Sequence, residues 1–209
     1  MSQSTEHEQY VAPDWNDIYR MGTPPWDSGQ AEPELVNLVD SGTIKPCPVL
    51  ELGCGTGTDS VYLAKKRFEV TAVESSPIAL ERARARAERE DALLRLVLGD
   101  VFDFAKDSGP FDFIYDRGFY HFIRRTDLDR FMDMLWRITQ PGSMYLVLAG
   151  NSGEQTEDGP PRVSEDELRN ELGRLFDFEH LKPFRFNSPA REEGYLGWSC
   201  LMRRPGMPQ

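Results

Sequence analysis

Three glycines at alternate positions constrain the fold of this sequence more than any other feature. The run ELGCGTGTD (residues 51–59) follows a short apolar stretch and contains Gly53, Gly55 and Gly57. Glycine permits a tight turn and lets the backbone approach a ligand where a side chain would not fit. A strand, a glycine loop and a helix N-terminus form the first unit of nucleotide-binding α/β folds. We therefore expect a parallel sheet with a ligand bound at this loop.

The remainder of the chain alternates between β-branched runs and amphipathic stretches, which is typical of βαβ units. Strands are predicted at 49–52, 69–74, 93–98, 111–115, 144–149, 178–186 and 195–202. Helices are predicted at 34–39, 59–66, 77–90, 128–138 and 165–175. The last two strands have no helix between them, which indicates an antiparallel hairpin. The sequence thus predicts an α/β fold: a Rossmann-like, doubly wound, seven-stranded, mainly parallel sheet with an antiparallel edge hairpin.

Acidic residues stand at or near the ends of the first three predicted strands. Glu51 places a negative charge beside the glycine loop, which suits an ammonium group better than a phosphate. Glu74 ends the second strand, where a carboxylate can accept hydrogen bonds from both hydroxyls of a ribose. Asp100 follows the third strand and can accept from an exocyclic amine, while Val101 and Phe102 pack on a base. Taken singly, each feature has an ordinary alternative, namely a tight turn or a solvated strand end.

Together, the glycines and acids in this order describe an adenosine ligand with a cationic amino-acid tail, which is S-adenosylmethionine. The predicted cofactor-binding residues in this part of the chain are Glu51, Gly53, Gly55, Gly57, Asp59, Glu74, Ser75, Asp100, Val101 and Phe102.

Residues 1–32 contain three aromatic residues that are unusual in a linker: Trp15, Tyr19 and Trp26. Their rings can face a sulfonium or an adenine of the cofactor. The alternative is that they only anchor the segment to the core. We expect residues 1–32 to form a lid over a domain at 33–209, with residues 1–14 protected by bound cofactor.

These features resemble the class I S-adenosylmethionine-dependent methyltransferases. Three outer motifs are similar to those of the thiopurine methyltransferase and plant halide/thiol methyltransferase superfamily: WNDIYRMGTPPWD at 15–27, DRG at 116–118 and GPP at 159–161. The resemblance covers about residues 15–203. It implies an N-terminal lid over the cofactor and methylation of sulfur, selenium or halide in small nucleophiles. The loop at 51–57 is closer to the generic methyltransferase loop than to the altered loop of the thiopurine enzymes, so the subfamily and substrate stay open.

Four residues after the fourth strand are the predicted substrate and catalytic residues: Asp116, Arg117, Tyr120 and His121. Asp116 is also expected to contact the cofactor. Arg117 is expected to hold an anionic group or stabilise a thiolate, or else to pair with an acid such as Asp116. His121 is a candidate general base or a partly buried histidine, and Tyr120 lines the pocket or packs in the core.

Three functions follow as hypotheses. The first is in-line methyl transfer to a small thiol, selenol or halide, for which the protein aligns the reactants and excludes water. A thiol supplies enough thiolate near neutral pH without a dedicated base. The alternative is N- or O-methylation of a small aromatic metabolite, which would need a positioned base. The third is a cofactor-binding module without catalysis.

Composition narrows the possible partners. With 24 Lys and Arg against 35 Asp and Glu, the net charge is −11, which disfavours nucleic acid and anionic membranes. The arginines at 82–89 are interleaved with Glu81, Glu88 and Glu90, and the pairs Arg84–Glu88 and Arg86–Glu90 are spaced i,i+4, which predicts a solvated helix face. No apolar run approaches the roughly 18 residues of a membrane span, the three cysteines lack CxxC spacing, and the three histidines stand apart. We expect a cytoplasmic protein without a metal, acting on a small molecule as a monomer or small homo-oligomer.

Overall fold

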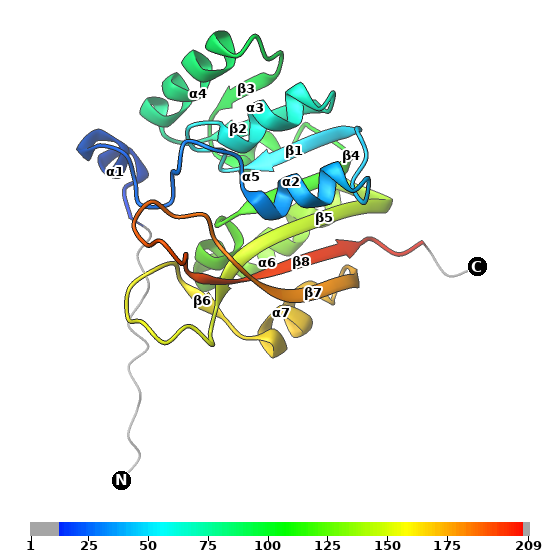
Figure 1. The fold of residues 1–209 in the computed structure, drawn as a ribbon. Helices are drawn as coiled ribbons and strands as arrows, with labels where there is room; N and C mark the ends of the chain where they lie inside the picture. The colour runs from blue at the N-terminus through cyan, green and yellow to red at the C-terminus, as the bar shows by residue number, and fades with distance from the viewer. Residues whose placement is uncertain (1–12, 207–209) are drawn as a thin grey trace.

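The computed structural model describes residues 13–206, which form a sheet with helices packed on it (Figure 1). The prediction for residues 1–14 therefore lies almost entirely outside the described residues. The helices are α1 (Trp15–Met21), α2 (Pro33–Asp40), α3 (Thr58–Lys65), α4 (Pro77–Arg89), α5 (Val101–Phe104), α6 (Tyr120–Ile138) and α7 (Glu165–Leu172). The strands are β1 (Pro48–Leu52), β2 (Glu69–Glu74), β3 (Arg95–Leu98), β4 (Phe111–Arg117), β5 (Thr139–Asn151), β6 (Arg162–Val163), β7 (Asp177–Arg185) and β8 (Leu196–Arg203).

The strand order confirms the predicted fold. Within residues 13–206 the main path of the sheet is β3-β2-β1-β4-β5-β8-β7, and the short β6 pairs with β5 outside this path. The neighbours from β3 to β5 are parallel, whereas β8 is antiparallel to both β5 and β7. The last two strands therefore form the predicted antiparallel hairpin at one edge.

The strands alternate their side chains between two apolar cores. Leu50 and Leu52 belong to the core that contains buried residues of α5, α6 and α7. Val49 belongs to the core that contains buried residues of α2, α3 and α4. Successive side chains of a strand point to opposite faces, so helices cover both faces of the sheet. This double cover explains why successive residues of a central strand, such as Phe113, Ile114 and Tyr115 of β4, are all apolar and buried rather than only alternate ones.

Three helices differ from the sequence prediction. The short helix α5 was not predicted; it begins after Asp100, whose carboxylate accepts a hydrogen bond from the backbone N–H of Phe102. The pattern did not predict α1, which begins after Asp14, whose carboxylate accepts hydrogen bonds from the backbone N–H groups of Asn16 and Asp17. Helix α6 begins at Tyr120 rather than at 128 and continues through a kink at Asp127, where φ is −154° and ψ is 64°. The amphipathic pattern revealed only the part of α6 after the kink.

The carboxyl ends of the parallel strands lie at one end of the sheet. Helix α1 and the loops that follow β5 and β7 gather at this same end (Figure 1). Segments far apart in the sequence thus enclose the strand ends that the glycine loop follows. Among the described residues, no helix has the length and apolar character needed to cross a membrane.

Candidate active site

A cavity of about 580 Å³ opens at the carboxyl ends of the parallel strands. Ligands of open α/β sheets bind at this position. Its walls come from the N-terminal segment, the loops after β1 to β4, the first turn of α6, and parts of the loops after β5 and β7. The predicted site residues that line it are Trp15, Tyr19, Trp26, Gly53, Glu74, Ser75, Asp100, Val101, Phe102, Arg117 and His121.

Glu74 is held in place by the backbone around it. Its Oε2 accepts a hydrogen bond from the N–H of Gly55 at 2.9 Å, and its Oε1 accepts from the N–H of Ser76 at 2.7 Å. The Ser75 hydroxyl donates to Oε1 at 3.3 Å. A carboxylate offers about four acceptor positions, so Glu74 keeps capacity for a hydroxyl group in the cavity. This fixed carboxylate at the end of β2 fits a ribose.

The glycine loop serves packing as well as the cavity. Gly53, Gly55 and Gly57 have φ values of 66°, 56° and 75°. A Cβ on Gly55 would lie 2.7 Å from the hydroxyl oxygen of Tyr19, and one on Gly57 would lie 2.9 Å from the Cβ of Ala83. Only Gly53 of the three lines the cavity. Gly55 and Gly57 instead let the N-terminal segment and α4 approach the loop.

Asp100 caps the N-terminus of α5 and lines the cavity. Its Oδ1 accepts a hydrogen bond from the N–H of Phe102 at 2.7 Å. Val101 and Phe102 are mostly buried and contribute apolar wall next to the carboxylate. An acceptor beside an apolar surface fits an adenine with its exocyclic amine. With Glu74 and Gly53, these residues fit the adenosyl part of S-adenosylmethionine.

Glu51 and Asp59 lie behind the loop and do not line the cavity. Glu51 is buried and accepts a hydrogen bond from the Ser60 hydroxyl. Burial, together with the neighbouring Asp59, raises the pKa of Glu51 to about 8. Asp59 accepts from the N–H of Glu32 at 2.7 Å and from the hydroxyl of Tyr115 at 3.0 Å. Glu51 therefore connects β1 to α3, and Asp59 connects α3 to Glu32 and to β4. A direct contact of either carboxyl with the cofactor stays a prediction.

Arg117 is paired with an acid, which was one of the two predicted alternatives. Its Nε lies 2.9 Å from the Asp59 carboxylate, and Asp116 is not its partner. One terminal nitrogen donates to the backbone carbonyl of Trp26 at 3.2 Å and lies 3.8 Å from the Glu32 carboxylate. Arg117 thus lines the cavity and connects the N-terminal segment to the start of α3.

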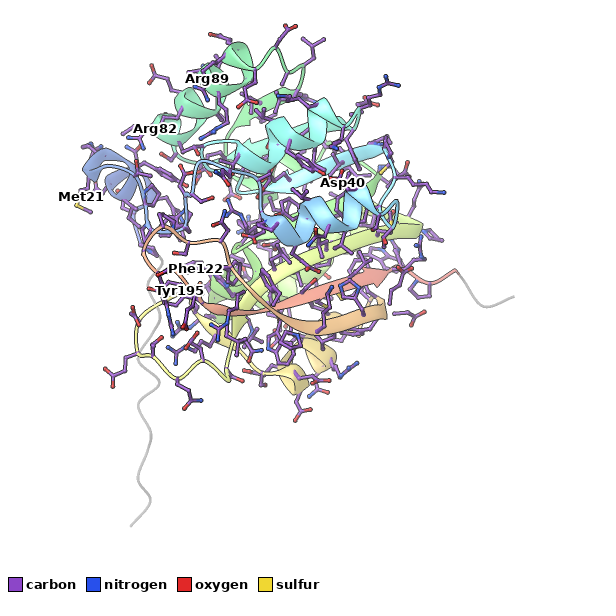
Figure 2. The ribbon with its side chains drawn as sticks, in the orientation of Figure 1. Met21, Asp40, Arg82, Arg89, Phe122 and Tyr195 are labelled. Atoms are coloured by element: carbon purple, nitrogen blue, oxygen red, sulfur yellow. The ribbon has the colours of Figure 1, made fainter. Side chains whose placement is uncertain are left out.

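Two arginines of α4 contradict the prediction of a solvated helix face. Arg82 donates to two backbone carbonyls at the end of α1, each at 2.8 Å, and Arg86 donates to the carbonyl of Gly29 at 3.0 Å. Figure 2 shows Arg82 on the part of α4 nearest α1, with Arg89 farther along the helix. The charge pattern could not reveal that backbone carbonyls from residues 60 positions away lie opposite this face.

Asp116 and Tyr120 do not line the cavity. Asp116 is buried and accepts from the N–H groups of Phe119 and Tyr120, at 2.8 and 2.9 Å, and from the Tyr145 hydroxyl at 3.0 Å. It thereby holds the first turn of α6. The Tyr120 hydroxyl donates to Glu171 at 2.6 Å. These contacts favour the core-packing alternative for Tyr120 and leave Asp116 without contact to the cavity.

His121 lines the cavity, but its contacts do not suit a general base. Its Nδ1 accepts a hydrogen bond from the backbone N–H of Gly150 at 3.1 Å. The imidazole is buried, and burial lowers the pKa of His121 to about 3. The ring nitrogen with the available lone pair is therefore already occupied. No group of three or more His, Cys, Asp or Glu side chains within residues 13–206 is arranged to hold a metal ion.

Comparison with known proteins assigns the family. The family model described as thiopurine S-methyltransferase (TPMT) matches residues 11–194. The chain belongs to this family. It is an S-adenosylmethionine-dependent methyltransferase, as the strand-end acids and the glycine loop predicted.

Two relatives of this thiopurine S-methyltransferase family member cover most of its length. The 2-heptyl-1-hydroxyquinolin-4(1H)-one methyltransferase of Mycobacteroides abscessus is 28% identical over 165 residues, which are 78% of this chain and 72% of the relative. Probable thiol methyltransferase 2 of Arabidopsis thaliana is 26% identical over 159 residues, which are 76% of this chain and 70% of the relative.

Solved structures confirm the fold. A structure titled "Conversion of a Disulfide Bond into a Thioacetal Group during Echinomycin Biosynthesis" has a TM-score of 0.79 at 23% identity and covers 93% of this chain and 91% of its own. TehB from Haemophilus influenzae has a TM-score of 0.66 at 20% identity and covers 82% of this chain and 62% of its own. At these identities the likeness concerns the fold.

The end of β4, the start of α6 and the loops after β5 and β7 form the part of the cavity wall that we call the acceptor half. It contains a group of apolar side chains beside the polar Asp158, Asn187 and Ser188, and sequence reasoning missed most of it. Its residues include Phe119, Phe122, Ile123, Pro160, Pro161, Phe186 and Tyr195. Figure 2 shows Phe122 and Tyr195 at the same end of the sheet. A Cβ on Gly150 would lie 2.3 Å from the Pro161 carbonyl oxygen, so glycine lets the 159–161 loop close on β5. Residues 159–161 form the GPP motif, but nothing in the sequence indicates that this loop lines the cavity.

Proposed function

We propose that this methyltransferase acts on a thiol or another small soft nucleophile, such as a selenol or a halide. The observation that carries the proposal is the apolar acceptor half of the cavity, in which the charged Arg117 is already paired with Asp59. Such a chamber favours a weakly hydrated nucleophile over a strongly hydrated one. The name of the Arabidopsis relative supports the same substrate class.

S-adenosylmethionine supplies an electrophilic methyl group on its sulfonium when it is bound. We assign Glu74 to the ribose, Asp100 with Val101 and Phe102 to the adenine, and Gly53 to the backbone contact beside the loop. Positioning and exclusion of water are the main tasks left to the protein. A thiol is partly ionised near neutral pH and needs no proton acceptor from the chain.

The N-terminal segment is proposed to act as a lid over this chamber. Trp15 packs edge-on against Phe122 of α6 with ring centroids 4.8 Å apart, and Trp26 lies edge-on to Tyr19 at 6.4 Å. Hydrogen bonds from Arg82 and Arg117 to backbone carbonyls hold the segment from outside the aromatic cluster. Opening these contacts would give a substrate access. The assembly state and the cytoplasmic location stay predictions.

O- or N-methylation of a small aromatic molecule is the second candidate. The Mycobacteroides relative, named for a hydroxyquinolinone, supports it. The aromatic side chains of the acceptor half, Phe122 and Phe186 among them, would suit a flat ring. A weakly acidic hydroxyl or amine would need a base, and His121 is not placed to serve as one.

The test is product analysis with methyl-labelled S-adenosylmethionine and a panel of thiols, selenide, halides, catechols and heteroaromatic amines. We expect label in thioethers, selenoethers or methyl halides. A Glu74→Gln variant should lose most of this activity, and a His180→Gln variant, changed outside the cavity, should keep it. Label found only in oxygen or nitrogen products would refute the soft-nucleophile assignment. Cofactor binding without any labelled product would favour a binding module.

A further inference from the structure

His121 presents one ring nitrogen to the protein and the other to the cavity. Nδ1 accepts a hydrogen bond from the backbone N–H of Gly150 at 3.1 Å. A nitrogen that accepts a hydrogen bond does not carry the proton, so the neutral imidazole carries it on Nε2. No residue in the described part of the chain accepts a hydrogen bond from Nε2 of His121. His121 is therefore a donor whose N–H lacks a protein partner.

The space beside Nε2 is kept open by a glycine. A Cβ on Gly118 would lie 3.4 Å from Nε2 and 3.6 Å from Cε1 of His121. Gly118 itself lines the cavity, and its φ of 96° disfavours other residues. The cavity therefore reaches the edge of the imidazole that carries the proton.

This donor lies near the cofactor loop. β1 and β4 are paired neighbours, with Leu52 opposite Asp116, so the chain after β4 runs beside the loop after β1. A Cβ on Gly53 would lie 3.4 Å from the Phe119 ring, two residues before His121. Gly53, Phe119 and His121 therefore belong to one region of the cavity wall.

No carboxylate of the described cavity wall is in hydrogen-bond contact with His121. The ionisable residues that line the described cavity are Tyr19, Glu74, Asp100, Arg117, His121, Asp158 and Tyr195. Glu74 and Asp100 hold backbone donors in the cofactor half, Arg117 is paired with Asp59, and Asp158 accepts from the Tyr195 hydroxyl at 2.9 Å. Burial raises the pKa of Tyr19 above its ordinary value and keeps His121 neutral, with a pKa of about 3.

We propose that His121 donates its Nε2–H to the methyl acceptor, and that the acceptor enters the site already ionised. This inference rests on the proposed function and names the residue that recognises the acceptor atom. The ligand class is a small apolar anion, such as an aromatic thiolate, whose charged atom accepts one hydrogen bond. A neutral donor stabilises an anion without competing for the methyl group as a nucleophile.

The chemistry balances without a proton transfer to the enzyme. The anionic sulfur of the acceptor forms the new carbon–sulfur bond while the bond from the methyl carbon to the sulfonium breaks. The electron pair of the broken bond stays on the departing sulfur. The charge of the anion and that of the sulfonium cancel, so the products are a neutral thioether and S-adenosylhomocysteine. His121 keeps its proton throughout.

A binding experiment tests this without turnover. The probe is 4-nitrothiophenol, whose ionisation changes its absorption spectrum, titrated with pH in the presence of the protein saturated with S-adenosylhomocysteine. We expect the bound probe to ionise at lower pH than the free probe. His121→Phe should abolish this shift and weaken thiolate binding about 10- to 100-fold, as expected for one hydrogen bond to a charged group. His121→Gln, which keeps an N–H donor, should retain part of both effects.

Controls separate a lost donor from a damaged fold. His121→Phe also leaves the Gly150 N–H without its partner, so its melting temperature and its affinity for S-adenosylhomocysteine must stay near those of the wild type. If this variant does not fold, Gly118→Ala takes its place, because the added Cβ would lie in van der Waals contact with Nε2 at 3.4 Å and fill the space beside it. His180→Gln is the matched control outside the cavity. An unshifted probe in the wild type, or an equal shift in His121→Phe, overturns the proposal.

Steady-state kinetics distinguish failure of the His121 inference from failure of the proposed function. For a series of para-substituted thiophenols, the pH at which kcat/KM levels off should follow the acidity of each thiol. A common inflection for all thiols would indicate a base in the enzyme and overturn the inference while S-methylation stands. Probe binding with the expected shift but no labelled thioether would overturn the proposed function and leave the donor assignment intact.

Discussion

Replacing Arg117 by Met should loosen the N-terminal segment and destabilise the fold. The guanidinium Nε lies 2.9 Å from Asp59, and the two side chains are 15% and 1% exposed. The same guanidinium donates to the Trp26 carbonyl, so one substitution removes both a buried ion pair and a contact to the proposed lid. Methionine fills similar space without charge, which limits the effect of an empty volume.

The expected loss of unfolding free energy depends on the hydrogen bonds that Asp59 retains in the variant. Removing one partner of a buried ion pair costs about 3–5 kcal/mol. Asp59 retains the Glu32 N–H and the Tyr115 hydroxyl as donors, so we expect the lower end, about 3 kcal/mol. A domain with about 5–15 kcal/mol of stability should still fold. With a urea dependence of about 3 kcal/mol per molar, the midpoint should fall by about 1 M.

A double-mutant cycle makes the test specific. Urea unfolding is measured for the wild type, Arg117→Met, Asp59→Asn and the double variant by circular dichroism. We expect an interaction energy of about 1–3 kcal/mol between the two sites. The reasoning is refuted if the single Arg117 variant costs less than about 1 kcal/mol and the two substitutions add within about 0.5 kcal/mol.

Three further predictions concern other contacts. Gly55→Ala should weaken S-adenosylhomocysteine binding in calorimetry, because its Cβ would lie 2.7 Å from the Tyr19 oxygen at a φ of 56°; unchanged binding would contradict this packing. Arg82→Ala should speed proteolysis near residue 22, because the carbonyls of Tyr19 and Gly22 lose their donor, whereas replacement of the exposed Arg84 by Ala should not. Burial raises the pKa of Glu32 from 4.5 to about 7. Between these two pH values the Glu32 carboxyl is protonated in the folded state and ionised in the unfolded state. Stability contributed by this group is therefore highest below about pH 4.5 and falls as the pH rises to about 7. Thermal melts across this range should show a flatter profile for Glu32→Gln, and parallel profiles would contradict the shift.

The sheet could be predicted because the residues of each strand form a recognisable local pattern in the sequence. Val49, Leu50 and Leu52 of β1 are apolar, as are Val70, Ala72 and Val73 of β2. Gly53 directly follows β1, and Pro77 stands three residues after β2. The cofactor half of the site followed from the same strands, since Glu74 and Asp100 are positioned by the strand ends they follow. The start of helix α4 could be predicted in the same way from Ser76 and Pro77, and Ser76 does cap this helix.

The acceptor half could not be predicted, because it is built from contacts across the chain. Phe122 meets Trp15 only after α6 and the N-terminal segment have docked, and Tyr195 reaches the cavity from the loop after β7. The arginines of α4 looked solvated because their partners are backbone carbonyls, which leave no mark in a charge pattern. The direction of the His121 imidazole depends on one hydrogen bond from Gly150. No local pattern encodes any of these contacts.

The most direct test of the account is calorimetric titration of S-adenosylhomocysteine into the wild type, Glu74→Gln and His180→Gln. We predict binding of one ligand per chain to the wild type and the His180 variant with equal affinity. Glu74→Gln should bind about 10- to 100-fold more weakly, because the fixed carboxylate is the proposed acceptor for the ribose hydroxyls. Equal affinity of all three proteins would contradict the placement of the cofactor at the end of β2, and with it the site built around that strand.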